Sequence, residues 1–180
     1  MIRRFGLFIA LAGAQAALAE DVVIDFEQAE IGKPVPTWAD KGVVFKLAGP
    51  LTQSKATGRV MFFPHLATGR KGVLNAMPND QGVPLKMTFP GVGASSVTLV
   101  LWGSTGCPAL LEALDKNGVV VDKASVPAVP GRKAPADAIP FFQLSVKAPE
   151  GSTIATIRFS GPRNGEFLAA DEVRFTIDAN

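Results

Sequence analysis

Several residue types that proteins commonly use for chemistry are scarce in this sequence. The 180 residues contain no tyrosine, two tryptophans, one histidine and one cysteine. With only His65 and Cys107 to offer, the chain lacks the cluster of imidazoles and thiolates that a zinc or iron site requires. A single cysteine also excludes an internal disulfide, so Cys107 is either a small buried apolar residue or a thiol that reacts or bridges to another molecule.

The same scarcity argues against catalysis. A Ser-His-acid arrangement would have to use His65, and the chain has no Gly-x-Ser-x-Gly motif; WGSTGC at 102–107 comes nearest but has a different spacing. Paired carboxylates can hydrolyse a glycosidic bond without histidine, yet no two acidic residues are placed by a motif in a recognisable cleft. The sequence therefore predicts a protein that is not an enzyme, with a glycan-active hydrolase as the less favoured alternative.

The first 19 residues have the pattern of a secretory signal peptide. Arg3 and Arg4 precede an apolar run over residues 5–12, and a small-residue segment ends in Ala17-Leu18-Ala19. The run is too short to anchor in a bilayer, and signal peptidase requires small side chains before its cleavage site. We expect cleavage after Ala19, leaving residues 20–180 as one secreted or periplasmic domain. An uncleaved amphipathic start is the alternative.

Charge and hydropathy limit the kinds of partner that we expect for residues 20–180. Arg3 and Arg4 account for the whole excess of 18 basic over 16 acidic residues, so residues 20–180 are balanced in charge. A balanced chain is a poor match for nucleic acid. No apolar run after residue 19 is long enough to predict a membrane span.

Short apolar runs separated by Gly, Pro, Asn and Asp fill the rest of the chain. Their spacing, near ten residues, is typical of an all-β sandwich, and no long helix is expected. Residues 30–41 and 56–81 are expected to be irregular. About nine antiparallel strands are predicted, at 22–27, 42–47, 84–89, 95–103, 109–115, 119–126, 140–148, 153–160 and in a terminal segment that includes 167–175.

One hairpin has a particularly clear signal. The apolar runs 109–115 and 119–126 flank Lys116-Asn117-Gly118. Asn-Gly between such runs supplies the positive φ values that a tight hairpin turn requires.

The order of these segments resembles a known family. VIDFE at the start, MTFPGVGASSVTLVLW, LEALDKNGVVVDKASV, APEGSTIATIRFS and a terminal AADEVRF are similar to the galactose-binding-like jelly rolls of secreted bacterial proteins and carbohydrate-binding modules. The similarity covers most of residues 20–180, and its motifs largely restate strand patterning. It implies a single-domain jelly-roll β-sandwich and says more about fold than about function.

The resemblance also implies a structural calcium ion that joins the first and last strands. The matching acidic positions here are Glu27 and Asp171, with Asp25 and Glu172 either helping or facing solvent. Two carboxylates near a strand end suit Ca²⁺, which prefers several oxygen ligands. The alternative is that Asp171 caps a turn by accepting hydrogen bonds from backbone N–H groups.

Jelly rolls of this kind hold sugars with an aromatic plate beside a few hydrogen-bonding side chains. Trp38 is the better candidate for an exposed plate, although it can equally fold back over the sandwich. The long segment 55–80 carries further candidate ligand-binding residues, namely Arg59, His65, Arg70 and Asn75, whose donors suit sugar hydroxyls or an acidic polysaccharide. The alternative is a pair of turns with solvated arginines.

Together these observations predict a secreted, non-catalytic module that binds a carbohydrate or other extracellular glycan. The alternative is a domain of the cell envelope that contacts another protein and does not bind glycans.

Overall fold

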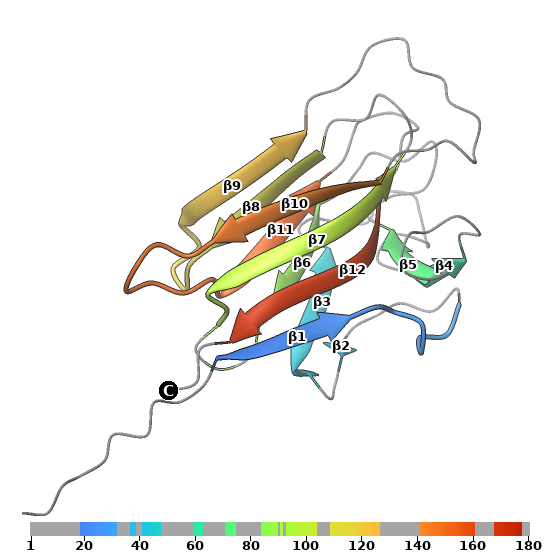
Figure 1. Cartoon of the computed structure of the whole chain (residues 1–180), viewed down its shortest axis with the longest axis horizontal. Coiled ribbons are helices and arrows are strands. Elements are labelled where there is room, and N and C mark those ends of the chain that lie inside the picture. The colour runs from blue at the N-terminus through green and yellow to red at the C-terminus, as the bar shows by residue number, and fades with distance from the viewer. Residues whose placement is uncertain are drawn as a thin grey trace, which may run out of the picture.

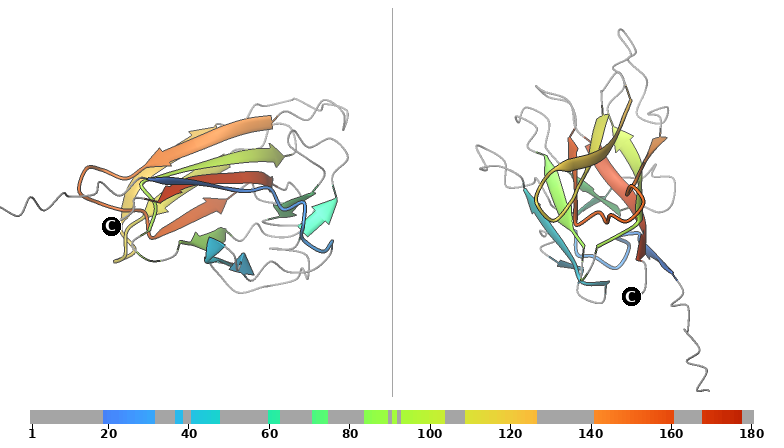
Figure 2. Two further views of the ribbon diagram at one scale, coloured as in Figure 1. Left: turned by 60° about the horizontal axis from the view of Figure 1, so that its bottom comes forward. Right: turned by 90° about the vertical axis from the view of Figure 1, so that its left-hand side faces the viewer.

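Alternating apolar and polar residues form β-strands throughout the part of this protein that the structure describes. In the computed structural model the described residues are 19–31, 37–38, 41–47, 60–62, 71–74, 84–89, 91, 93–103, 109–126, 141–160 and 168–177. They form two six-stranded sheets that pack face to face (Figure 1; Figure 2). Every strand pairing within the two sheets is antiparallel. The predicted all-β sandwich is therefore confirmed.

The first sheet lies toward the viewer in Figure 1. Its strands run in the order β10 (Phe141–Lys147), β7 (Ser96–Gly103), β12 (Leu168–Ile177), β5 (Lys71–Leu74) and β4 (Val60–Phe62), and β1 (Glu20–Ile24) also pairs with β12. The second sheet lies behind it. Its order is β2 (Thr37–Trp38), β3 (Val43–Leu47), β6 (Leu85–Thr88), β11 (Thr156–Ser160), β8 (Ala109–Leu114) and β9 (Val120–Val126).

Nine of these strands lie where the sequence predicted them, and three lie where it predicted irregular structure. The three are β2, β4 and β5, so the expectation for residues 30–41 and 56–81 was wrong at these positions. None of the three contains a proline. β2 starts directly after Pro36, and β4 and β5 pair with each other as a hairpin. β2 and β4 are edge strands, where a neighbouring proline is tolerated because only one side of the strand must hydrogen-bond.

The core lies between the sheets and follows from the two-residue period of each strand. Phe89, directly after β6 of the second sheet, contacts Phe175 of β12, with ring centroids 4.8 Å apart, and Phe26 meets Phe45 edge to face at 5.8 Å. Burying each large apolar side chain stabilises the fold by about 1.5–3 kcal/mol. The most deeply buried large side chains are Phe26, Phe159, Ile24, Leu85, Met87, Leu99, Leu101, Leu111, Ile154, Ile157 and Val43.

The predicted hairpin between β8 and β9 is present, but its turn differs from the expected one. Gly118 has a φ of +79°, whereas Asn117 does not have a positive φ. Asp115 N–H donates to the carbonyl of Val119, which gives a three-residue loop with glycine at its last position. The Asp115 carboxylate accepts hydrogen bonds from the N–H groups of Val119 and Asn117, and these bonds hold the pKa of Asp115 below its ordinary value.

A short bridge joins the start of β7 to the segment before β11. Ala94 and Ile154 exchange backbone hydrogen bonds of 2.9 and 2.7 Å, which links the two layers at one end. Gly93 precedes this bridge with a φ of +98°, and a Cβ atom there would lie 2.5 Å from the Ile154 carbonyl oxygen. Only glycine therefore fits beside the bridge.

No helix in the described part of the chain has the apolar length needed to cross a membrane.

We expect Gly93→Ala to destabilise the protein more than Gly91→Ala. Gly91 also has a positive φ, +58°, but a Cβ there would meet nothing within 4 Å. Gly91→Ala should thus lower the free energy of unfolding by about 1–2 kcal/mol, because alanine disfavours the left-handed conformation. Gly93→Ala adds a collision with a backbone carbonyl and should cost on the order of 4 kcal/mol. Urea unfolding of both variants measures the difference, and equal losses would contradict this account of the bridge.

Candidate functional site

The outward side of the first sheet carries polar residues on four adjacent strands. Val22, Val173, Val97 and Leu144 point to the core, so their neighbours along the chain point outward. The outward residues at the centre of this sheet, which we call the polar face, are Asp21 and Val23 of β1, Arg174 and Thr176 of β12, Ser96 and Thr98 of β7, and Ser145 of β10.

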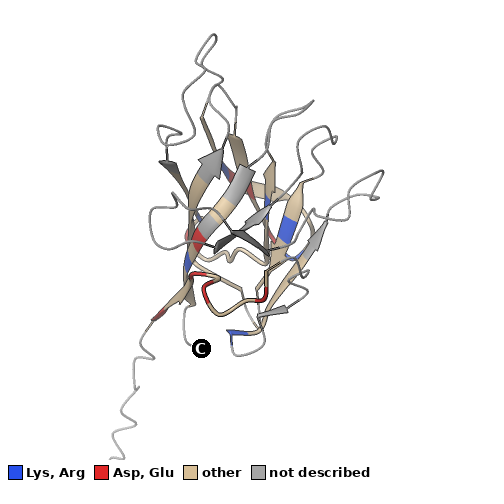
Figure 3. Cartoon of the chain, turned by 90° about the vertical axis from the view of Figure 1, so that its right-hand side faces the viewer, with Lys and Arg blue, Asp and Glu red and all other residues tan. Residues whose placement is uncertain are grey.

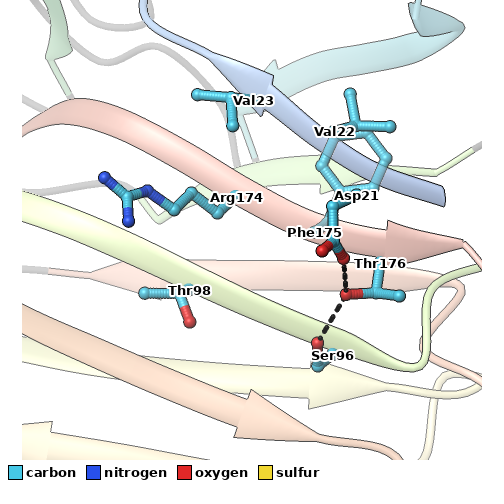
Figure 4. Close-up of a pocket in the computed structure, with 8 residues that line it drawn as sticks. All are labelled: Asp21, Val22, Val23, Ser96, Thr98, Arg174, Phe175 and Thr176. Carbon is cyan, nitrogen blue, oxygen red and sulfur yellow. Dashed lines mark hydrogen bonds between the residues drawn. The ribbon is translucent and has the colours of Figure 1, made fainter.

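The antiparallel register arranges the polar face in rows that cross the strands. One row contains Asp21, Thr176 and Ser96, which are direct partners in the β1–β12 and β12–β7 pairings. Thr176 Oγ1 donates to Asp21 Oδ1 at 2.7 Å, and Ser96 Oγ donates to Thr176 Oγ1 at 3.2 Å (Figure 4). This chain of hydrogen bonds fixes the orientation of three side chains from three strands.

The next row contains Val23, Arg174, Thr98 and Ser145. Thr98 and Ser145 share a hydrogen bond of 2.9 Å between their hydroxyl oxygens. The Arg174 side chain is 55% exposed, and Val23 is 51% exposed. Figure 4 shows the Arg174 side chain extending along the surface between β12 and Thr98. The row therefore offers guanidinium, hydroxyl and methyl groups side by side.

The two rows enclose a shallow hollow of about 360 Å³. This volume lies within the range of roughly 300–1,000 Å³ that small-molecule sites occupy. The residues that line it are Asp21, Val22, Val23, Ser96, Thr98, Arg174, Phe175 and Thr176. Because its polar side chains come from strands and not from loops, the sheet hydrogen bonds hold them in place before any ligand arrives.

A buried carboxylate lies next to the polar face on the same strand. Glu172 pairs in register with Val100 on the outward side of the sheet, yet only 5% of its surface is exposed. Its carboxylate forms an ion pair and hydrogen bond with Nε of Arg174. That hydrogen bond, together with the carboxylate's charge, raises the pKa of Arg174 above its ordinary value. Glu172 thus orients the guanidinium and leaves its terminal nitrogens available.

The chemistry of the hollow is that of a binding site. It presents one carboxylate, one guanidinium and three hydroxyls, a set that donates and accepts hydrogen bonds in several directions.

The two predicted calcium ligands come from segments that meet at one edge of β12. β1 pairs with Val173–Ile177, and β5 pairs with Ala169 and Ala170 on the same side, so Asp171 lies where one neighbour gives way to the other. The register of β12 against β7 also shifts between Ala170 and Glu172, which makes Asp171 the extra residue of a β-bulge.

Glu27 lies in the turn that directly follows β1. Phe26 has a φ of +60°, the Ala29 N–H donates to the Phe26 carbonyl, and Glu27 N–H donates to Asp25 Oδ1 at 3.1 Å. The pairing of β1 with β12 therefore ends at Ile24 and Val173, close to the bulge at Asp171. Oxygen donors from these two segments suit Ca²⁺ chemically. The side chain of Asp171 is outside the described residues, which contain no group of three or more His, Cys, Asp or Glu side chains placed to hold a metal.

The predicted sugar ligands are only partly within the described chain. Trp38 is the second residue of β2 and pairs with Val43, but its side chain is not among those described. Arg59, His65, Arg70 and Asn75 lie outside the described residues, as does Cys107. Their assignment as ligand-binding residues stays a prediction.

The sequence analysis did not identify the polar face. Asp21, Arg174 and Thr176 each occupy an ordinary outward position of a strand, and only the pairing of β1 with β12 brings them together. These two strands are separated by almost the whole chain. Alternation could mark each residue as outward, but the one indication that the first and last strands lie together was the calcium ion between them that the family resemblance implies.

Comparison with known proteins supports the fold. No family model matches this sequence, and no curated protein matches it. The K2 cleaved adhesin domain of Lys-gingipain aligns with 87% of this chain and 98% of its own, with 14% identity and a TM-score of 0.53. At this identity the likeness shows a shared fold alone. The expected jelly-roll resemblance is therefore confirmed as a statement about fold.

Other solved structures align with lower scores. The K1 cleaved adhesin domain of Lys-gingipain from Porphyromonas gingivalis W83 matches 91% of this chain and 99% of its own, at 12% identity and a TM-score of 0.43. TmCBM61 in complex with β-1,4-galactotriose matches 84% of this chain and all of its own, at 12% identity and a TM-score of 0.46.

We expect Arg174→Gln to destabilise the protein more than the double variant Glu172→Gln/Arg174→Gln. The single variant removes the guanidinium that the structure pairs with a buried carboxylate, which should lower the free energy of unfolding at neutral pH because the carboxylate loses its partner. The double variant removes both charges and should recover most of this loss. Urea unfolding at pH 7 tests the order of stabilities; a double variant less stable than the single would contradict the pairing of Arg174 with the buried Glu172 carboxylate.

Proposed function

We propose that this protein is a secreted, non-catalytic module that binds a carbohydrate on the polar face. The observation that carries the proposal is the pre-ordered chain of hydrogen bonds from Asp21 through Thr176 to Ser96, beside an exposed arginine. Sugars present vicinal hydroxyls, which both donate and accept hydrogen bonds. A fixed array of carboxylate, guanidinium and hydroxyl groups complements them.

Two side chains keep free hydrogen-bonding capacity toward a ligand. Within the described part of the chain, Asp21 uses Oδ1 for Thr176 and has no protein partner at Oδ2. Arg174 uses Nε for Glu172, and its two terminal nitrogens have no described partner. Asp21 can thus accept from one sugar hydroxyl while Arg174 donates to another.

Apolar contact on the polar face is modest. Val23 is half exposed beside Arg174, and its methyl groups can pack against the C–H face of a sugar ring. An aromatic plate would add more, and Trp38 remains our candidate for that role. Arg59, His65, Arg70 and Asn75 remain candidates for additional contacts from the segments around β4 and β5, which belong to the same sheet as the polar face.

A structural calcium ion is part of this proposal. Glu27 and Asp171 would hold it with carboxylate oxygens, aided by backbone carbonyls of the turn after β1 and of the bulge in β12. The ion would offset the repulsion of acidic residues at this edge and tie the first strand to the last. In this role it would stabilise β1, which carries Asp21, without contacting the sugar itself.

Secretion is also part of this proposal. β1 begins at Glu20, so cleavage after Ala19 would leave the strand whole. Glu20 pairs with Ile177 of β12, and the new amino terminus would lie at the end of the polar face. Mass spectrometry of the exported protein gives the position of cleavage directly.

We expect Asp21→Asn to weaken glycan binding at least tenfold and Glu20→Gln to leave it unchanged. Losing a charge-assisted hydrogen bond costs about 1.5–3 kcal/mol. Glu20 is the matched control because it is the adjacent acidic residue of β1 and does not line the hollow. Binding would be found with a glycan array of residues 20–180 and measured by calorimetry, and the same glycans would be checked for cleavage.

The remaining outcomes of this experiment separate the alternatives. Loss of affinity in Arg70→Ala or Trp38→Ala, with Asp21→Asn unaffected, would move the site to the segments predicted from sequence. Absence of any glycan signal from a folded protein would favour the envelope interaction domain instead. Release of reducing sugar by the wild-type protein would overturn the non-catalytic assignment.

We expect Ca²⁺ to raise the thermal midpoint of the wild-type protein and not that of Asp171→Asn. A ligand that binds only the folded state stabilises it by about 2.7 kcal/mol at a hundredfold excess over its Kd. Thermal unfolding in chelator and then in millimolar CaCl₂ measures the effect. Glu150→Gln, which removes an exposed carboxylate elsewhere, is the control and should respond like the wild type. An unresponsive wild type would make Asp171 a turn or bulge residue only.

A further inference from the structure

The second sheet carries a row of charged residues across its outward side. Lys86 of β6 pairs in register with Arg158 of β11, Arg158 pairs with Glu112 of β8, and Glu112 pairs with Lys123 of β9. On the other side of Lys86 the backbone register continues to Lys46 of β3, whose side chain is not among those described. We call Lys86, Arg158, Glu112 and Lys123 the charged row.

The members of the charged row point away from the core. The residues before and after Lys86, Arg158 and Glu112 along their strands are all buried core residues. Lys86 and Lys123 are exposed, and the side chains of Arg158 and Glu112 are 36% and 19% exposed. Figure 3 views the sandwich from its side, with basic positions in blue and acidic positions in red on strands of both layers.

The charges within the row do not cancel. Glu112 Oε2 accepts hydrogen bonds from Arg158 Nε at 2.8 Å and Nη2 at 2.7 Å, which holds the guanidinium in one orientation. Lys86 lies on the other side of Arg158 and, among the described residues, has no carboxylate partner. Like charges that face each other on adjacent strands destabilise a sheet. An anion between Lys86 and Arg158 would remove this repulsion.

The cations of the charged row lie in one row across the strands and do not spread over the sheet. The outward residues on one side of the charged row are uncharged. They include Thr88 and Thr156, whose hydroxyl oxygens are 3.4 Å apart. Those on the other side, including Ser160 and Leu110, are uncharged as well. Neighbouring strands are about 4.8 Å apart, so Lys86 and Arg158 lie one strand spacing apart and Lys123 lies two strands beyond Arg158, with Glu112 between them. A linear polyanion matches this arrangement better than a membrane surface does.

We propose that the charged row is a second ligand site, which binds the carboxylate groups of an acidic polysaccharide chain. Arg158, oriented by Glu112, and Lys86 hold one carboxylate between them, and Lys123 contacts the chain further along. The site lies on the opposite sheet from the polar face and does not depend on the function proposed for that face.

The test is binding of polygalacturonate to residues 20–180, with uncharged dextran as the control polymer. Lys86→Glu reverses one charge at an exposed position and should lower the affinity at least tenfold. Lys116→Glu makes the same change of net charge at the exposed turn between β8 and β9 and should lower it less than threefold. Binding should also weaken as salt is raised, because the contacts are ionic. Arg158→Gln should reduce affinity, and a thermal melt will show whether it folds.

Any of four results would overturn the proposal. Equal losses in Lys86→Glu and Lys116→Glu would mean that net charge, and not the row, attracts the polymer. Absence of polygalacturonate binding, or equal binding of dextran, would exclude an acid-selective site. Stronger binding to vesicles of anionic phospholipid than to the polymer would replace the polysaccharide with a membrane. Lys86→Glu should lower the affinity for polygalacturonate by the same factor in an Asp21→Asn background as in the wild type, which distinguishes this site from the polar face.

Discussion

The pairing of β12 with three other strands is the constraint on which the first sheet depends. β12 hydrogen-bonds to β7 along one side, and on the other side to β1 near its end and to β5 near its start. The bulge at Asp171 lies where β5 gives way to β1 along β12. Because β1 occupies the end of β12, the first and last strands that the structure describes are neighbours.

The pairing of β1 with β12 creates the polar face. Asp21 meets Thr176, and Val23 meets Arg174, only because β1 and β12 are paired antiparallel in one register. A shift by one residue would turn Asp21 toward Phe89 and Phe175 and expose Val22, so the hydrophobic core enforces the register. Core packing and the arrangement of the polar face are thus set by the same pairing. A calcium ion at the bulge would strengthen it further.

Much of the fold could be predicted from the sequence because its signals are local. Alternation marked nine strands, and Gly118 marked the β8–β9 hairpin. β2, β4 and β5 were missed because two to four residues show little periodicity. The polar face and the charged row were missed for another reason. Each depends on which strands lie side by side, as in the pairing of Arg158 with Lys86 and Glu112. Pairing between distant strands leaves no local pattern.

We propose that a glycan binds to the polar face, and an NMR titration of isotope-labelled residues 20–180 with the best-binding glycan, following every backbone amide, tests this. We expect the largest shifts on β1, β7 and β12, at Asp21, Ser96, Arg174 and Thr176. Shifts confined to residues 55–80, or to the strands of the second sheet, would contradict it.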